Sequence, residues 1–360
     1  MANNILPIGF FFILSLLHFS LNFSKAQKVP AIYVFGDSLV DVGNNNYLEL
    51  SVAKANFPHN GIDFPTKKAT GRFSNGKNAA DFIADKLGLP SSPPYLSLKS
   101  KNDSSFLTGV SFASGGAGIF DGTDEVFKQA IPLTKQVSFY LSVHEKLEQQ
   151  LGASRAQEHL SKSLFVIVIG SNDLLDYFGS SLLRKYTTPQ QYVEEMLFSL
   201  EEQLRKLHSY GARKILVAGI PPIGCCPYER RKSNTEECIK EENDLSAKYN
   251  EGLKAMLERL KSELKDINYS FVDTLSVLLN LIQNPSDGFT EVKSACCGLG
   301  KLRADVPCLP IAHYCKNRRD HIFWDLYHPT EATASILVDV IFDGPSQYTF
   351  PINLKQLIAL

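Results

Sequence analysis

The stretch AIYVFGDSLVDVGNNN, residues 31–46, begins as an apolar run and becomes polar abruptly at Gly36, Asp37 and Ser38. An apolar run without polar alternation indicates a strand that is buried on both faces. A turn at the end of this strand would account for the glycine and the aspartate. A catalytic serine would account for all three residues, provided that other segments supply a base and hydrogen-bond donors for an oxyanion.

Other segments of the chain repeat the pattern of a buried strand followed by a helix. Short β-rich runs occur at residues 164–170 and 214–220, with 267–273 as a fourth strand candidate and 109–113 as a weaker one. Segments with the helical period occur at residues 78–88, 133–151, 190–209, 239–266 and 330–342. Strands without polar alternation suit a parallel sheet that is covered by helices on both faces. We therefore predict a three-layer α/β/α fold with a mainly parallel sheet and right-handed crossovers.

Three polar clusters follow predicted strands directly. They are Gly36-Asp37-Ser38, Ser114-Gly115-Gly116 and Gly170-Ser171-Asn172-Asp173. Because sites in open parallel sheets form at the carboxyl ends of the strands, we expect these clusters to lie together. A Gly-Gly step lets backbone N–H groups approach a ligand closely, and the amide of Asn172 can also donate. A plain turn at 114–116 and an Asx turn at Asn172 remain the alternatives.

One histidine of the chain has the neighbours that a catalytic base needs. After residue 26 the chain contains His59, His144, His159, His208, His313, His321 and His328. Only His328, in the stretch FWDLYHPT, has an aspartate three residues before it and a proline after it. A spacing of three residues in a turn brings the two side chains together. One loop could therefore hold both a base and the carboxylate, Asp325, that orients it.

The N-terminus has the pattern of a secretory signal peptide. Residues 5–19 form an apolar run too short to span a bilayer as a helix, and Ser24-Lys25-Ala26 places small residues where signal peptidase reads them. We predict a signal peptide over residues 1–26 and a single domain over residues 27–360. An N-terminal anchor helix is the alternative. No later run of eighteen apolar residues occurs, so we expect no transmembrane segment in the mature chain.

Charge and cysteine content narrow the class of protein. The formal net charge is −1 and no basic block suggests binding to nucleic acid. Seven cysteines fit an oxidising compartment, whereas zinc binding would call for a spacing that adjacent Cys-Cys pairs lack. An odd total leaves one thiol unpaired. Asn102 and Asn268 begin glycosylation triplets, which would be used in a secreted protein.

Taken together, these motifs resemble the GDSL esterase/lipases of plants, which belong to the SGNH hydrolase superfamily. The family takes its name from Gly-Asp-Ser-Leu, which is residues 36–39 here. The segments that resemble family blocks are FGDSLVDVGNNN, GRFSNGKNAADFIADKLGLP, GVSFASGGAGI, GSNDL and FWDLYHPTEA, together with PPIGCCP and ACCGLG. The resemblance covers nearly the whole chain after residue 26, and it implies a flavodoxin-like α/β/α architecture of the SGNH type.

The resemblance also implies a role for each residue of the site. Ser38 would be the nucleophile, His328 the general base and then the acid, and Asp325 the residue that orients His328. The oxyanion hole would comprise the N–H of Ser38, the N–H of Gly116 in preference to Gly115, and the Asn172 amide. No metal or cofactor is expected.

The resemblance gives a partial pairing of the cysteines. Cys226 falls at a variable position of the family motif and is our candidate for the free thiol. Cys225 would then pair with Cys238. The remaining four, Cys296, Cys297, Cys308 and Cys315, would form two bridges among themselves, with three connectivities open.

The function implied is that of a secreted, monomeric serine esterase or lipase of the apoplast or cell wall. It would hydrolyse carboxylic esters of small molecules or polymers through an acyl-enzyme. Within this class, acetylated wall polysaccharides and acyl transfer between lipids are alternatives to the hydrolysis of acyl lipids. A catalytically silent carbohydrate- or lipid-binding protein on the same scaffold is an alternative of another class.

Overall fold

The centre of the molecule is a five-stranded sheet. A computed structural model describes residues 29–98, 104–123, 128–285 and 288–360 of the chain. The strand order is β1 (Ile32–Gly36), β2 (Leu164–Val168), β3 (Lys214–Ala218), β4 (Asn268–Val272) and β9 (Thr349–Phe350). The first four strands are parallel, and β9 joins one edge in the antiparallel direction. The four predicted strands are therefore the four parallel strands of the sheet, while the short antiparallel edge strand was not predicted.

The weaker strand candidate, 109–113, pairs with the other edge of the sheet. The N–H of Val34 donates to the carbonyl of Val110 at 3.0 Å, and the N–H of Phe112 donates to that of Val34 at 2.7 Å. It forms isolated bridges rather than a regular strand, with Ser111 paired to Val34 on one side and to Pro94 on the other. The segment still runs parallel to β1, so the polar cluster 114–116 lies near the carboxyl end of β1, as Gly36-Asp37-Ser38 does.

The helices predicted from periodicity are present, with others between them. The helices are α2 (Ala79–Leu87), α3 (Leu133–Leu151), α4 (Ala153–Lys162), α5 (Ser171–Gly179), α6 (Ser181–Tyr186), α7 (Pro189–Ser209), α8 (Pro227–Arg230), α9 (Lys240–Glu263), α10 (Thr274–Gln283), α11 (Glu331–Asp343) and α12 (Leu354–Ala359). Short 3-10 turns occur at η1 (Asn44–Tyr47), η2 (Tyr95–Ser97), η3 (Ser104–Leu107), η5 (Ile223–Cys225) and η6 (Lys301–Arg303). The polar cluster after β2 thus opens the helix α5 instead of forming only a turn.

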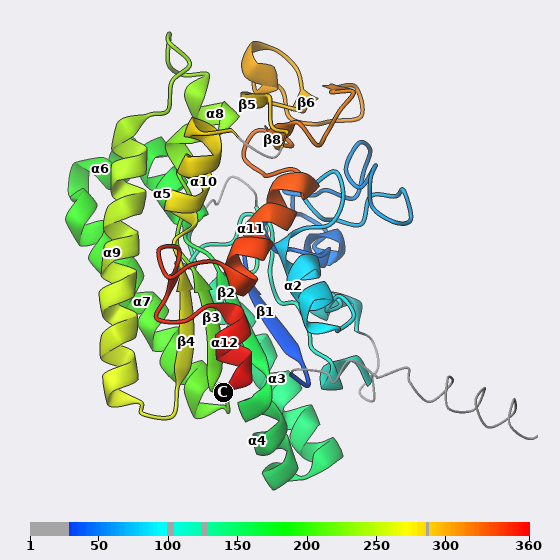
Figure 1. Cartoon of the computed structure of the whole chain (residues 1–360), viewed down its shortest axis with the longest axis vertical. Helices are drawn as coiled ribbons and strands as arrows, with labels where there is room; N and C mark the ends of the chain where they lie inside the picture. The colour runs from blue at the N-terminus through cyan, green and yellow to red at the C-terminus, as the bar shows by residue number, and fades with distance from the viewer. Residues whose placement is uncertain (1–28, 99–103, 124–127, 286–287) are drawn as a thin grey trace, which may run out of the picture.

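Two hydrophobic cores lie on opposite faces of the sheet. Tyr33 and Phe35 of β1 pack with α3, α7 and α9, whereas the alternate residues Ile32 and Val34 pack with α2, α11 and α12. The helices accordingly form a layer on each side of the strands (Figure 1). This is the predicted three-layer α/β/α architecture with a mainly parallel sheet.

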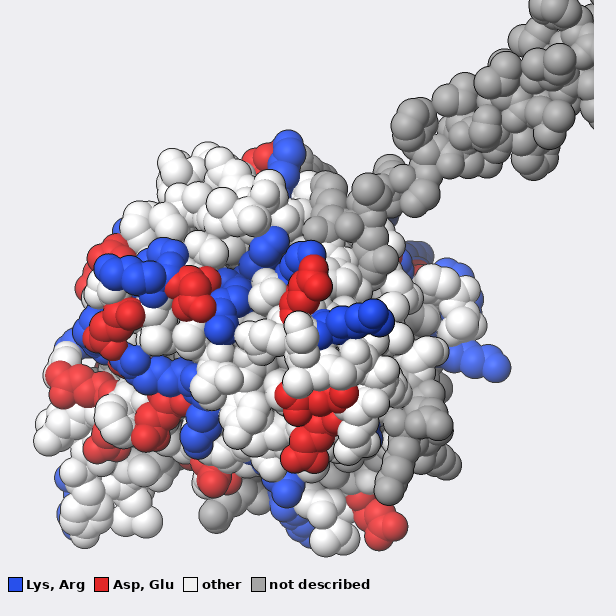
Figure 2. All heavy atoms as spheres, turned by 90° about the horizontal axis from the view of Figure 1, so that it is seen from below, with Lys and Arg blue, Asp and Glu red and all other residues white. Residues whose placement is uncertain are grey.

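The face of the molecule in Figure 2 carries charges of both signs without separation into large blocks. On the face shown in Figure 2, lysine and arginine side chains alternate with aspartate and glutamate side chains. This agrees with the formal net charge of −1. In the described part of the chain, no helix combines enough length with enough apolar character to span a bilayer.

Disulfides join the loops that precede the turn carrying Asp325 and His328. Strand β5 (Glu291–Ala295) pairs with β8 (His321–Phe323), and β6 (Cys297–Gly298) pairs with β7 (His313–Tyr314). Bridges join Cys225 to Cys238, Cys296 to Cys315 and Cys297 to Cys308, and Cys226 is a free, buried thiol. The Cys225–Cys238 bridge is the expected one. For the other four cysteines, the structure has one of the three connectivities that were left open, namely Cys296–Cys315 with Cys297–Cys308.

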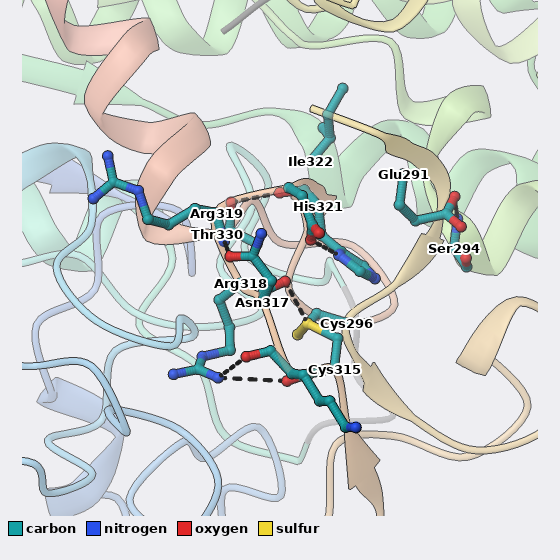
Figure 3. Close-up of polar contacts among 12 residues, drawn as sticks. Glu291, Ser294, Cys296, Cys315, Asn317, Arg318, Arg319, His321, Ile322 and Thr330 are labelled. Carbon is teal, nitrogen blue, oxygen red and sulfur yellow. Dashed lines mark hydrogen bonds and ion pairs between the residues drawn. A yellow bond between two sulfur atoms is a disulfide. The ribbon is translucent and has the colours of Figure 1, made fainter. Parts of the chain in front are cut away.

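Side-chain contacts reinforce the bridged region. Arg318 donates to the carbonyl of Cys315 at 3.5 Å, and Thr330 donates to the carbonyl of His321 at 2.8 Å (Figure 3). The first contact supports the loop that the Cys296–Cys315 bridge closes. The second supports the chain on either side of the Asp325–His328 turn. Hydrogen bonds therefore hold both the Cys296–Cys315 loop and the segments that flank the Asp325–His328 turn.

Two predicted features of the precursor lie outside the described residues, namely the signal peptide over residues 1–26 and the glycosylation site at Asn102. The second glycosylation candidate, Asn268, is half-buried at the start of β4. Its side-chain oxygen accepts a hydrogen bond from Lys261 Nζ at 3.1 Å. Glycosylation at both positions stays a prediction.

Candidate active site

Ser38 lies at the carboxyl end of β1, where the chain turns sharply over β2. The N–H of Asp37 donates to the carbonyl of Val168 at 3.0 Å, which brings the turn against the end of the neighbouring strand. A Cβ atom on Gly36 would overlap that same carbonyl oxygen, so only glycine fits at this position. The turn therefore places the half-buried Ser38 at the mouth of the sheet.

A glutamine that sequence reasoning did not identify holds this turn. Gln136 lies on α3 and is fully buried. Its Oε1 accepts from the N–H of Gly36 at 2.8 Å, and its Nε2 donates to the carbonyl of Gly36 at 2.8 Å. Both backbone groups of the residue at the end of β1 are thus fixed by one side chain from a distant helix.

The loop after 109–113 lies against the same turn. The N–H of Ser114 donates to the carbonyl of Gly36 at 3.0 Å, and the N–H of Gly115 donates to buried Asp41 Oδ2 at 3.0 Å. Gly116 follows with a φ of 80° and lines the cleft beside Ser38. Within the described residues, no acceptor is bonded to the N–H of Gly116 or of Ser38. The arrangement leaves the Gly116 N–H available to a ligand and the Gly115 N–H occupied.

Asn172 lies in the first turn of α5 and not at the end of a strand. Its Nδ2 donates to the carbonyl of Ala117 at 2.9 Å. This bond uses one amide hydrogen and orients the other, because an amide group is planar. Asp173 receives hydrogen bonds from the N–H groups of Ile119 and Phe120 at 2.9 and 3.1 Å, so α5 also fixes the loop that follows the glycines.

Asp325 and His328 form a close pair in the turn between β8 and α11. His328 Nδ1 lies 2.7 Å from Asp325 Oδ1 and 2.9 Å from Oδ2. Oδ1 also accepts from the N–H groups of Tyr327 and His328, at 3.0 and 2.9 Å. The N–H of Trp324 donates to the carbonyl of His328 at 2.7 Å, which closes the turn. The carboxylate therefore fixes both the ring and the backbone of His328.

One cleft brings the predicted site residues together. Its volume is about 310 Å³, and Ser38, Gly116, Asn172, Asp325 and His328 all line it. In the described part of the chain, no hydrogen bond joins Ser38 to His328. In enzymes without substrate, the distance between a catalytic serine and its base is often long, and it shortens when substrate binds. The five residues come from four separate segments of the chain.

Comparison with known proteins shows what kind of protein carries this cleft. The family model of GDSL-like lipases and acylhydrolases matches residues 32–341. The chain belongs to this family. A GDSL esterase/lipase of Arabidopsis thaliana is 54% identical over 344 residues, which cover 93% of this chain and 91% of that protein. Two others from Arabidopsis thaliana are 39% and 38% identical, covering 87% and 96% of this chain and 88% and 97% of their own. The protein is a carboxylic ester hydrolase.

In this GDSL family member, the environment of Asp325 keeps its carboxyl group ionised. Burial alone would raise the pKa of Asp325. The charge of His328 and the hydrogen bonds from His328 and Tyr327 outweigh burial and hold the pKa below the ordinary value of an aspartate. An ionised partner favours a proton on Nδ1 of His328 and leaves Nε2 as the acceptor.

Asp37 is a second acidic group of the GDSL cleft, and its pKa is shifted in the opposite direction to that of Asp325. Its Oδ1 accepts from the N–H of Leu39 at 2.9 Å, while its Oδ2 is buried with no hydrogen-bond partner among the described residues. Burial raises the pKa of Asp37 to about 7. The Asp37 side chain therefore accepts a hydrogen bond within its own turn.

The other described histidines lie outside this cleft. His208 Nε2 lies 2.7 Å from Asp266, and His321 Nδ1 lies 2.6 Å from Asp320. His59 Nε2 lies 3.0 Å from the carbonyl of Ala312. Among described residues, no group of three or more histidine, cysteine, aspartate or glutamate side chains could hold a metal ion.

Proposed function

We propose that this ester hydrolase is a secreted serine esterase that works through an acyl-enzyme on Ser38. The observation that carries the proposal is the convergence of three groups on one cleft. These are the Ser38 hydroxyl, the Asp325–His328 pair, and backbone N–H groups without an intramolecular acceptor. Acyl transfer needs a nucleophile, a base and oxyanion donors, and these groups are of the required types.

In the first half of the reaction, His328 acts as the base. Ser38 Oγ attacks the acyl carbon while its proton passes to Nε2 of His328, and Asp325 stabilises the imidazolium through Nδ1–H. The C–O bond to the alcohol then breaks. The proton on Nε2 goes to the departing oxygen, so the alcohol leaves neutral and the acyl group stays on Ser38.

The negative oxygen of the tetrahedral intermediate would be held by three donors. They are the N–H groups of Ser38 and Gly116 and the free hydrogen of the Asn172 amide. All three belong to residues that line the cleft. Fixed donors stabilise the developing charge without reorganisation during the reaction, which is why they contribute mainly to the transition state.

Water completes the reaction by the reverse use of the same groups. His328 takes a proton from water, the hydroxide oxygen attacks the acyl carbon, and the bond to Ser38 Oγ breaks. The proton on Nε2 returns to Ser38, and the carboxylic acid leaves. No group outside the protein and water is needed to balance either half.

Secretion is part of the proposal. Three disulfides in the fold suit an oxidising compartment. We propose that residues 1–26 direct export to the apoplast and are removed, and that residues 27–360 form a single, monomeric domain. The proposed substrates are esters of small molecules or polymers.

A fluorophosphonate probe tests the nucleophile. Wild-type protein should be labelled and Ser38→Ala should not, with ester hydrolysis reduced to near the background. Ser209→Ala, at the exposed end of α7, is the control and should be labelled normally. Equal labelling of Ser38→Ala and wild type would rule out the assignment.

A further inference from the structure

A second cavity adjoins the cleft. Its volume is about 90 Å³, and it separates the carboxyl ends of β2, β3 and β4 from helices α2, α10 and α11. Val168, Leu216 and Val272 form its floor on the sheet, and Ala334, Leu337 and Ile341 of α11 form part of the opposite wall. Figure 1 shows α2 and α11 side by side over this part of the sheet.

The cavity and the cleft share a wall. Leu39, Phe73, Pro221, Cys226 and Tyr327 line both. The ring of Phe73 lies 4.9 Å from the imidazole of His328, measured between centroids. Leu39 follows the proposed nucleophile directly. The boundary between the two spaces is therefore next to the acyl carbon of any ester that is bound to Ser38.

The polar side chains around the cavity are already satisfied by protein partners. Asn78 caps α2 and donates to the carbonyl of Asp41 at 2.9 Å. Thr274 donates to the carbonyl of Gly219, and Ser74 accepts from the N–H of Gly76 at 3.2 Å. Burial also raises the pKa of the Cys226 thiol, which keeps it neutral. No group that lines the cavity calls for a polar ligand, so its occupant should be apolar.

We propose that this cavity receives the acyl chain of the substrate. The inference rests on the proposed function, in which the ester carbonyl sits at Ser38. From there an unbranched chain passes between Phe73 and Tyr327 and ends against Leu216 and Ala334. The alcohol part of the ester stays in the open cleft. This assigns the enzyme to esters of linear acyl chains longer than acetyl, since only a chain that extends past the shared wall can fill the cavity.

Substitution of one alanine tests the assignment. Ala334→Leu places a larger side chain in the cavity, and Ala332→Leu makes the same change on the same helix outside it. The measurement is kcat/KM for the p-nitrophenyl esters of acetate, butyrate, hexanoate and octanoate. Wild type should gain up to about fourfold for each methylene that becomes buried. Ala334→Leu should lower the octanoate-to-acetate ratio by about tenfold or more, because it removes the space of two or more methylenes. Ala332→Leu should keep the wild-type ratio.

An enlarging substitution covers the case in which Ala334→Leu does not fold. Leu337→Ala removes a half-buried side chain from the same wall and should move the preferred acyl chain one or two methylenes longer. An unchanged ratio in folded Ala334→Leu, an equal change in Ala332→Leu, or an unchanged preference in Leu337→Ala would overturn the acyl pocket. Ester hydrolysis that persists in Ser38→Ala would instead overturn the proposed function, so the two failures are distinct.

Discussion

At the scale of single residues, Asp325 combines two tasks that are often divided between groups. One oxygen, Oδ1, contacts the imidazole and accepts from two backbone N–H groups of the same turn. The carboxylate therefore sets the ring orientation and the shape of the loop at once. An amide in its place could accept at one atom only, and it would present N–H groups to a ring nitrogen that needs an acceptor.

Asp325→Asn should therefore lower kcat about 10⁴-fold, the loss seen when the aspartate of a serine-protease triad is changed in this way. The measurement is hydrolysis of p-nitrophenyl butyrate, with circular dichroism to verify the fold. The chain offers a matched control in Asp320→Asn, because Asp320 contacts Nδ1 of His321 at 2.6 Å outside the cleft. Activity that is equal in the two variants would contradict the role of Asp325.

Asn172→Ala should lower kcat about 10²–10³-fold, with KM little changed, because an oxyanion donor acts mainly in the transition state. Its bond to the Ala117 carbonyl is lost as well, so some loss of thermal stability should accompany the change. Kinetics and thermal melting on the same preparation separate the two effects. A destabilised variant with normal turnover per folded molecule would remove Asn172 from the site.

At the scale of elements, the paired cysteines support the turn that carries Asp325 and His328. The N–H of Cys296 donates to the carbonyl of Phe323 at 2.9 Å, and that of Cys297 donates to the carbonyl of Trp324 at 2.7 Å. The two residues immediately before Asp325 are thus bonded to two bridged residues. Rigidity introduced by the disulfides passes directly to the backbone of the proposed base.

Removal of one bridge should consequently affect activity as well as stability. We expect Cys297→Ala combined with Cys308→Ala to lower the free energy of unfolding by about 2–4 kcal/mol. We also expect kcat to fall at temperatures well below the melting midpoint, because the Asp325–His328 turn loses its support. Differential scanning fluorimetry and initial rates at low temperature measure the two effects. Full kcat in a destabilised variant would show that the bridge supports the fold alone.

The elements also show how far sequence reasoning reaches. Strands β1 to β3 could be predicted because each contains a short apolar run that is buried on both faces, and β4 because its segment is rich in residues that favour strands. The long helices could be predicted because each has one apolar face. Helix α10 was not predicted, because it is only ten residues long and six of them are apolar, so its sequence TLSVLLNLIQ is difficult to distinguish from a buried strand. The role of Gln136 could not be predicted, because its partner Gly36 is a hundred residues away and the contact exists only in the fold.

Some residues of the proposed site could be predicted from the sequence, whereas the evidence for others comes only from the fold. Ser38, Asp325 and His328 could be predicted, because each belongs to a short motif whose residue types and spacing suit a catalytic site. The choice between Gly115 and Gly116 had only the resemblance behind it until the bond from Gly115 to Asp41 gave it a physical reason. Such a bond depends on how two loops meet, which no local pattern records.

At the scale of the whole molecule, acidic groups buried near the carboxyl edge of the sheet link stability to pH. Burial raises the pKa of Asp37 to about 7 and that of Asp41 to about 6. Unfolding returns both groups to an ordinary pKa of about 3.9. Between these values the folded state binds more protons than the unfolded state, so the free energy of unfolding falls as pH rises. Asp325 acts in the opposite direction, but its lowered pKa matters only below about pH 4.

The melting midpoint should therefore be higher at about pH 5 than at about pH 8, since most of the titration of Asp37 and Asp41 lies between those values. Asp37→Asn removes one of the two groups and should reduce the difference. Each kcal/mol shifts the midpoint of a large domain by about 2–4 °C. Scanning fluorimetry over pH 4–9 makes the comparison, with Asp320→Asn, outside the cleft, as the control. A midpoint that rises steadily from pH 5 to pH 8 would contradict this account.

The distribution of the cleft residues along the chain has a consequence for biosynthesis. Ser38 leaves the ribosome 290 residues ahead of His328, and the bridged loops from Cys296 to Cys315 emerge shortly before that histidine. The nascent polypeptide consequently carries its proposed nucleophile for most of translation without a partner to activate it. With the roles proposed here, ester cleavage requires both segments, so the enzyme would become active only after the segment that carries Asp325 and His328 has been synthesised.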